Sequence, residues 1–136
     1  MATVVVTGCN RGIGFQLCKQ LSSRGDEVIG VCRMASDHVR ALGIRLIEGI
    51  DVGADACIDR LREALGDERI DLIVNNAGIL RRDRFGEMDY AAMLEQYQVN
   101  TLGPLRVTEA MLGNLCLLYT SPSPRDATLS RMPSSA

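Results

Sequence analysis

The chain has 136 residues, a formal net charge of -2 and 24% charged residues. This length suits one domain or part of one, and the charge balance excludes the strongly basic surface that binds nucleic acid or anionic membranes. Gly8, Asn10 and Arg11 interrupt the first residues before an apolar run reaches the length of a signal peptide, and no membrane-length run follows. We therefore expect a cytoplasmic protein with neither nucleic-acid nor membrane partners.

The cysteines and the single histidine do not form a metal-binding pattern. No C-x-x-C pair occurs, and most of the cysteines stand in apolar segments, which favours reduced thiols over disulfides or metal ligands. His38 has no cysteine or carboxylate at metal-ligand spacing and is predicted to lie on a helix surface. We expect no metal site. The five cysteines are Cys9, Cys18, Cys32, Cys57 and Cys116.

The first motif is a glycine-rich turn between a predicted strand and a predicted helix. The apolar, β-branched residues 3–6 precede Gly8, Gly12 and Gly14, and a helical pattern begins near Ile13. A pyrophosphate can approach the backbone closely where no Cβ intervenes, and there it meets the free N–H groups at a helix start. The G-x-x-x-G-x-G spacing differs from the usual G-x-G-x-x-G. A tight turn without a ligand is the alternative.

A second strand is predicted over Glu27–Cys32, after a helix that ends at Gly25. Together these elements form a β-α-β unit, which requires a parallel sheet. No acidic residue ends the second strand, where Asp or Glu would bind a ribose 2′-hydroxyl. Instead Arg33 follows the strand and Arg11 lies in the glycine turn. Both could pair with a 2′-phosphate through hydrogen bonds of about 1.5–3 kcal/mol each. This favours NADP(H) over NAD(H); solvated loop charges are the alternative.

The next elements lead to a carboxylate at a strand end. Ser36 is predicted to cap a short helix that reaches residue 42, and a third strand is predicted over residues 44–50. Asp51 then either accepts a hydrogen bond from an adenine amino group or caps the helix that begins near Ala54. That helix is predicted to end at Gly66.

A fourth strand, residues 70–74, runs directly into Asn75-Asn76-Ala77-Gly78. Adjacent asparagines are costly to bury, so they require hydrogen bonds to backbone or ligand. A long helical pattern over residues 89–112 follows, and Gly103-Pro104 in its middle predicts a kink near Asn100. The apolar face predicted for this helix comprises Met93, Tyr97, Leu105 and Leu112.

Together these motifs resemble a classical short-chain dehydrogenase/reductase. The resemblance rests on Thr7-Gly8-x-x-x-Gly12-x-Gly14, Asp51, Asn75-Asn76-Ala77-Gly78 and Val99-Asn100, in this order. It covers residues 1–115 and implies an α/β doubly wound parallel-sheet Rossmann fold, truncated after the fourth strand and its following helix. It also implies a nicotinamide cofactor and hydride transfer to or from a small carbonyl or alcohol. More loosely, residues 79–81 and 100–104 resemble the carbonyl-reductase-like or C-factor-like branch.

The resemblance assigns a role to each matching residue. Asn100 would be the structural member of the catalytic set, with a helix distortion that frees a backbone carbonyl to hold a water in the proton relay. Asn10 and the glycines would surround the pyrophosphate, Asp51 and Val52 the adenine, and Asn76 to Gly78 the ribose. The full-length protein would be a homo-oligomer. The cofactor-binding residues implied are Gly8, Asn10, Arg11, Gly12, Ile13, Gly14, Arg33, Asp51, Val52, Asn76, Ala77 and Gly78.

The chain departs from the family pattern in its catalytic half. The family requires a serine after a fifth strand and a Tyr-x-x-x-Lys, whose tyrosine donates the proton while the lysine lowers its pKa. Lys19 is the only lysine and precedes every tyrosine. We therefore expect the chain as written to be inactive, although it derives from an oxidoreductase. The alternative function is that of a non-catalytic nucleotide-binding or regulatory fragment.

Residues 116–136 differ from the rest. They resemble the translation of a transposon-derived sequencing adapter, so we interpret them as a non-native tail after an incomplete domain of residues 1–115. A genuine Ser/Pro-rich disordered tail is the alternative. If the fifth strand is missing, residues 70–74 are expected to form an exposed apolar sheet edge.

Overall fold

The computed structural model describes residues 1–115; the tail interpretation concerns residues outside this range. Strands and helices alternate along the chain, as predicted for a doubly wound fold. The elements are β1 (Thr3–Thr7), α1 (Gly12–Arg24), β2 (Glu27–Val31), α2 (Asp37–Arg40), β3 (Arg45–Ile47), α3 (Ala56–Leu65), β4 (Leu72–Val74), α4 (Tyr90–Tyr97), the π-helix η1 (Gln98–Leu102) and α5 (Gly103–Ala110).

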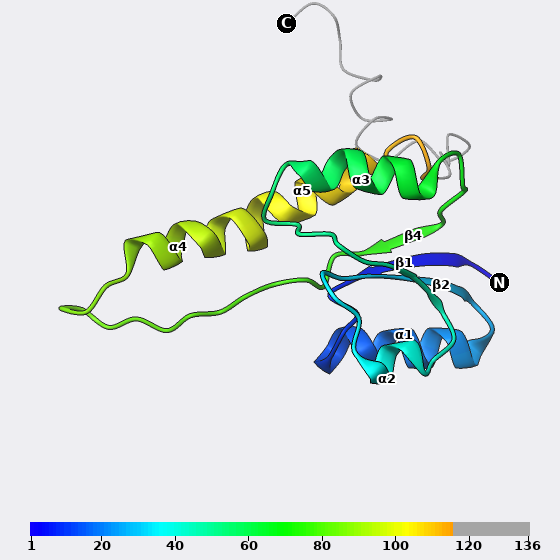
Figure 1. Ribbon diagram of the computed structural model, residues 1–136, viewed down its shortest axis with the longest axis horizontal. Coiled ribbons are helices and arrows are strands. Elements are labelled where there is room, and N and C mark those ends of the chain that lie inside the picture. The colour runs from blue at the N-terminus through cyan, green and yellow to red at the C-terminus, as the bar shows by residue number, and fades with distance from the viewer. Residues whose placement is uncertain (116–136) are drawn as a thin grey trace, which may run out of the picture.

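The four strands form one parallel sheet in the order β3-β2-β1-β4. Helices α1 and α2 lie on one face, and α3 and α5 lie on the other (Figure 1). Val4, Val5 and Val6 of β1 are completely buried, and because successive side chains point to opposite faces they enter both cores. The predicted Rossmann-like α/β fold is confirmed.

Strand β4 is shorter than predicted and pairs only with β1 among the described strands. Leu72 is 47% exposed, as expected for an apolar residue at a sheet edge. The same expectation is wrong for Ile70, which is completely buried. Its N–H donates to the carbonyl of Asn114 at 2.8 Å, so the turn after α5 covers this position.

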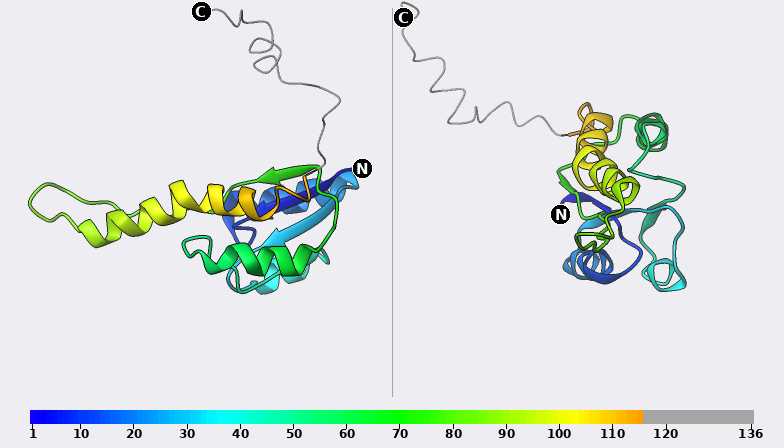
Figure 2. Two further views of the ribbon diagram at one scale, coloured as in Figure 1. Left: turned by 90° about the horizontal axis from the view of Figure 1, so that it is seen from above. Right: turned by 90° about the vertical axis from the view of Figure 1, so that its left-hand side faces the viewer.

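The long helical pattern is interrupted where the kink was predicted. Asn100 lies within η1, and α5 begins at Gly103-Pro104. Helix α4 and the loop before it extend beyond the sheet, whereas α5 lies beside α3 (Figures 1 and 2). In the described part of the chain, no helix has both the length and the apolar character needed to cross a bilayer.

The apolar face predicted for this helix is wrong for three of its four residues. Tyr97, Leu105 and Leu112 are each more than half exposed. A Cβ placed on Gly103 would lie 3.1 Å from a Val52 side-chain carbon, so the close approach at this position favours glycine and turns the Gly103 side of the helix toward Val52. A π-helix also changes the angular spacing of side chains, which moves the face away from the simple helical period. The buried face comprises Gly103, Arg106, Val107, Ala110 and Met111.

Candidate cofactor-binding site

The glycine turn lies at the carboxyl end of β1, the edge of the sheet at which all four parallel strands end. Gly8 and Gly12 have φ angles of 67° and 57°, in the left-handed region that favours glycine. A Cβ on Gly14 would lie 2.1 Å from the carbonyl oxygen of Gly8. The sequence motif is therefore a steric requirement of this turn.

Helix α1 begins directly after the turn with its first N–H groups free of a side-chain cap. Arg11 is its N-cap residue and makes no capping hydrogen bond, and the first turn holds no acidic residue. A Cβ added to Gly12 would have no other atom within 4 Å, apart from its chain neighbours and the backbone of its own helix. Ile13 is 74% exposed beside it. Free N–H groups at a helix start with open space before them suit a pyrophosphate.

The segment after β4 is hydrogen-bonded to the glycine turn. The amide nitrogen Nδ2 of Asn76 donates to the carbonyls of Thr7 and Gly8, at 3.1 Å each. The hydroxyl oxygen of Thr7 accepts from the N–H groups of Asn76 at 3.1 Å and Ala77 at 3.0 Å. The expectation that the asparagines need partners is confirmed for Asn76, whereas Asn75 is exposed. The sequence places Thr7 in the family motif but does not predict these contacts, because they join residues 69 and 70 positions apart.

Asn100 holds the next residues of the same segment. Its Oδ1 accepts from the N–H of Ile79 at 2.8 Å, and its Nδ2 donates to the carbonyl of Ile79 at 2.7 Å. A Cβ on Gly78 would lie 3.2 Å from Asn100 Oδ1, so glycine leaves room for this contact. The structure thus brings η1 against the loop after β4. The catalytic role of Asn100 stays a prediction.

Asp51 does not cap the following helix, so that interpretation is wrong. Its carboxylate accepts from the N–H of Gly53 at 2.9 Å, the two-residue reach of an Asx turn. Helix α3 begins at Ala56, and Asp55 stands at its N-cap position. The third strand ends at Ile47, so the Asp51 carboxylate is engaged in a turn of the loop that follows β3. Adenine contact by Asp51 or Val52 stays a prediction.

A buried arginine that the sequence analysis missed supports this region. The guanidinium of Arg106 donates to the carbonyls of Val52 at 3.1 Å and Gln98 at 2.9 Å, and to the Gln98 side chain at 2.5 Å. It also pairs with Asp55 at 2.7 Å. One carbonyl of the π-helix, that of Gln98, is therefore bound by protein. An arginine in an otherwise amphipathic helix is normally read as solvated, so only the fold identifies it.

The two arginines predicted to bind a 2′-phosphate are exposed at the same edge. Arg11 and Arg33 make no ion pair within residues 1–115. The neighbouring Arg40, in contrast, pairs with Glu48 at 2.7 Å. The N–H of Ala35 and the charge of Arg40 lower the pKa of Glu48 below its ordinary value. Two uncompensated cations therefore stand beside the glycine turn.

Three free thiols lie in the core cluster at the glycine turn, to which Cys9 belongs, and a fourth lies on the opposite face of the sheet. Cys9, Cys18 and Cys32 are buried in one core cluster, and Cys57 belongs to the other. The prediction of reduced core thiols is confirmed for these four; Cys116 lies outside the described residues. Burial raises the pKa of Cys32 to about 12, and the hydrogen bond to Cys18 together with burial raises that of Cys9. Within residues 1–115 no group of metal-binding side chains is assembled.

The raised thiol pKa predicts a loss of stability in alkaline solution. A Cys32 pKa raised from 9.0 to about 12 favours the neutral thiol in the folded state, so this contribution is complete below pH 9 and is lost as the pH rises toward 12. We expect urea unfolding to show a steeper decrease in stability above about pH 9 for the wild type than for Cys32→Ala. An identical pH dependence of the two proteins would contradict this.

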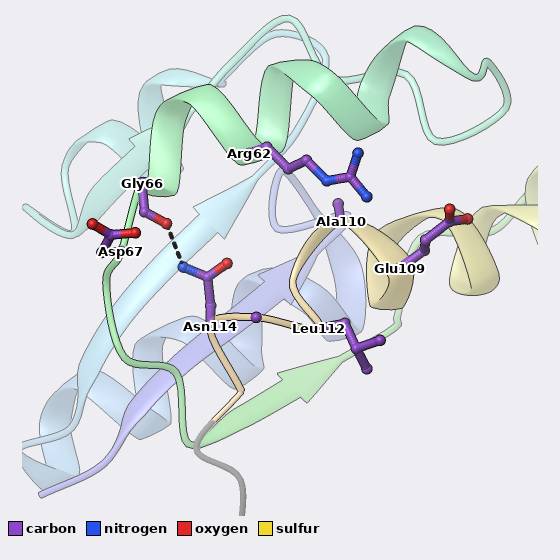
Figure 3. A pocket seen from close by; sticks show the side chains of 8 residues that line it. Arg62, Gly66, Asp67, Glu109, Ala110, Leu112 and Asn114 are labelled. Carbon is purple, nitrogen blue, oxygen red and sulfur yellow. Dashed lines mark hydrogen bonds between the residues drawn. The ribbon is translucent and has the colours of Figure 1, made fainter.

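An open depression of about 520 Å³ lies away from this edge, between the end of α3 and the turn after α5. Figure 3 shows Arg62, Asp67 and Glu109 around it, with Asn114 donating to the carbonyl of Gly66 at 2.7 Å. Arg62 lies in α3 and Glu109 in α5, while Asp67 and Asn114 lie in the turns after these helices, at the amino end of the fourth strand. The depression is therefore separate from the glycine turn.

A glycine turn that opens a helix, joined to the ends of neighbouring parallel strands, defines a Rossmann-type nucleotide-binding domain. The family model for short chain dehydrogenases matches residues 2–118. The chain belongs to the short-chain dehydrogenase family.

Individual relatives agree with this assignment. The chain is 34% identical over 113 residues to 1-hydroxy-2-glutathionyl-2-methyl-3-butene dehydrogenase of Rhodococcus sp. (strain AD45), covering 82% of this chain and 50% of the relative. It is 35% identical over 124 residues to mouse retinol dehydrogenase 13, covering 83% and 36%. The chain thus spans half or less of the length of these curated relatives.

Solved structures give the same result. A carbonyl reductase from Pseudomonas aeruginosa PAO1 superposes with a TM-score of 0.74 at 32% identity, covering 85% of this chain and 57% of that protein. An NADPH-bound carbonyl reductase from chicken fatty liver superposes with a TM-score of 0.72 at 28% identity, covering 84% and 51%.

Proposed function

We propose that this chain is the cofactor-binding part of an NADP(H)-dependent oxidoreductase acting on a small carbonyl or alcohol. The observation that carries the proposal is a pair of exposed arginines, Arg11 and Arg33, that make no ion pair within residues 1–115. They stand beside a glycine turn whose neighbouring strand ends without an acidic residue. A 2′-phosphate would compensate both charges, whereas an unphosphorylated ribose would leave them solvated. The NADPH in the chicken carbonyl reductase supports this choice.

Each group of residues would bind a different part of the dinucleotide. The N–H groups at the start of α1 would hold the pyrophosphate, with Gly8 and Gly12 providing the close approach and Asn10 and Ile13 beside it. Asp51 and Val52 would contact the adenine. Asn76, Ala77 and Gly78 would line the ribose, and Asn100 would keep that segment against η1. The nicotinamide supplies the hydride acceptor or donor.

Proton transfer requires groups that this chain does not contain. In this chain no tyrosine is followed four residues later by lysine. We propose that the complete protein carries them, is cytoplasmic and assembles as a homo-oligomer. The missing pair also favours the second candidate, a nucleotide-binding fragment without catalytic activity. Titrating the chain with NADPH tests the binding that both candidates predict. Adding NADPH and a panel of carbonyls to the complete protein separates them, because only the oxidoreductase predicts turnover there.

The cofactor preference has its own test in Arg33→Asp. Removing one charge-assisted hydrogen bond and adding a repulsive carboxylate should weaken NADPH binding about 10- to 100-fold relative to NADH. Fluorescence titration of both dinucleotides measures the ratio. Arg62→Asp, which makes the same charge change beside the depression near α5, is the matched control and should leave the ratio within about twofold. An unchanged ratio in Arg33→Asp would refute the role of Arg33.

A further inference from the structure

The glycine turn is joined to the loop after β2 by a reciprocal pair of hydrogen bonds. The N–H of Ser36 donates to Asn10 Oδ1 at 2.5 Å, and the Ser36 hydroxyl donates to the Asn10 carbonyl at 3.0 Å. Both bonds are partly buried and connect residues 26 positions apart. We call this pair the Asn10–Ser36 link.

Further bonds hold the same loop. The Ser36 hydroxyl oxygen also accepts from the N–H of Val39 at 3.3 Å and so caps α2, as its sequence position predicted. Glu48 accepts from the N–H of Ala35 at 2.9 Å. The carbonyl of Arg33 accepts from the N–H of Gly49 at 2.9 Å. The loop backbone is thus held from three directions, while the Arg33 side chain extends into solvent.

The link connects the backbones that carry Arg11 and Arg33, neither of which makes an ion pair within residues 1–115. Arg11 follows Asn10 directly, and Arg33 stands three residues before Ser36. The attraction of two cations for one phosphate depends on their separation, and a loop that must be ordered on binding loses affinity to conformational entropy. A hydrogen bond that orders the loop before the ligand binds reduces this entropy loss. It should therefore strengthen binding of a phosphate held between the two arginines more than binding of the rest of the ligand.

We propose that Ser36, through its link to Asn10, is a positioning residue that determines selectivity for a dinucleotide bearing a ribose phosphomonoester over one without it. This inference rests on the proposed NADP(H) function. Ser36 sets the distance between the guanidinium groups of Arg11 and Arg33 and does not need to touch the phosphate. Asn10 lies beside the expected pyrophosphate position as well, but the N–H groups that open α1 make no hydrogen bond with this loop within residues 1–115. We therefore expect the unphosphorylated dinucleotide to be much less affected by the position of the loop.

The test measures the dissociation constants of NADPH and NADH for the 136-residue chain and three variants. Ser36→Ala removes the hydroxyl, and we expect the NADPH constant to rise about tenfold while the NADH constant changes by less than about twofold. Ser36→Thr keeps the hydroxyl and should restore wild-type selectivity. Ser23→Ala makes the same deletion near the end of α1, where the serine has no side-chain hydrogen bond within residues 1–115, and should change neither constant.

The outcomes separate this inference from the proposed function. If the wild-type chain prefers NADPH and the Ser36→Ala variant keeps the same preference, the role of the link is overturned, while the proposed NADP(H) function stands. Equal loss of NADPH and NADH affinity in Ser36→Ala, with recovery in Ser36→Thr, shows a merely structural role and also overturns it. Wild-type chain that binds both dinucleotides equally, or neither, overturns the proposed NADP(H) function and the inference with it.

Discussion

Gly14→Ala is expected to lower the free energy of unfolding by about 3 kcal/mol and to abolish dinucleotide binding. The added Cβ would lie 2.1 Å from the Gly8 carbonyl oxygen and 2.5 Å from Asn76 Nδ2. Neither neighbour can move freely, because Asn76 is bonded to the carbonyls of both Thr7 and Gly8. The methyl group therefore displaces the glycine turn from the segment after β4. Urea unfolding monitored by circular dichroism measures the loss.

Two other glycines serve as controls for this substitution. Gly113→Ala meets no atom within 4 Å and has no left-handed backbone, so we expect a change within about 0.5 kcal/mol. Gly12→Ala also meets no atom, but its φ of 57° adds a backbone cost of about 1–2 kcal/mol. If Gly14→Ala were as mild as Gly113→Ala, the close packing of the turn against Gly8 would be wrong.

Arg106→Met should cost about 3 kcal/mol of stability, because it leaves one buried acceptor and two partly buried ones without their donor. The carbonyls of Val52 and Gln98 and the Gln98 side chain all lose a hydrogen bond from the guanidinium. Methionine retains a long apolar side chain, so the loss reports chiefly on the polar contacts. The junction of α5, η1 and the loop after β3 should loosen, which urea unfolding and amide exchange of residues 98–102 would detect.

Asp55→Asn distinguishes the carbonyl contacts from the ion pair. The Asp55 side chain is 87% exposed, so its charge is screened by solvent, and we expect a cost below about 1 kcal/mol. The asparagine oxygen can still accept from Arg106. If Asp55→Asn were as destabilising as Arg106→Met, the ion pair would be the dominant contact and the carbonyl explanation would fail.

Much of the architecture follows from local patterns. The β-branched run before Gly8, the helical spacing that ends at Gly25 and the second apolar run together require a parallel β-α-β unit. Ser36 caps α2 because a serine side chain can bond to the N–H three residues later whatever the rest of the fold does. Gly103-Pro104 likewise predicts an irregular helix, and η1 lies directly before it. These features depend on neighbours within a few positions.

The tertiary structure alone decided features that depend on distant partners. Ile70 is buried only because the turn after α5 covers it, and Leu105 is exposed because Gly103 brings the other face of α5 against Val52. Arg106 is a buried donor for a loop 54 residues earlier, although its residue type predicts a solvated charge.

The glycine turn shows the same division. Its residue types and spacing could be recognised from the sequence, since left-handed φ angles and close approach both require glycine. Its connections to Asn76 and Ser36 could not, because a hydrogen bond between residues separated by 26 or 68 positions leaves no local pattern. The sequence by itself thus determined the parallel sheet and the candidate pyrophosphate turn. Tertiary contacts decided how that turn is held and which side chains remain free around it.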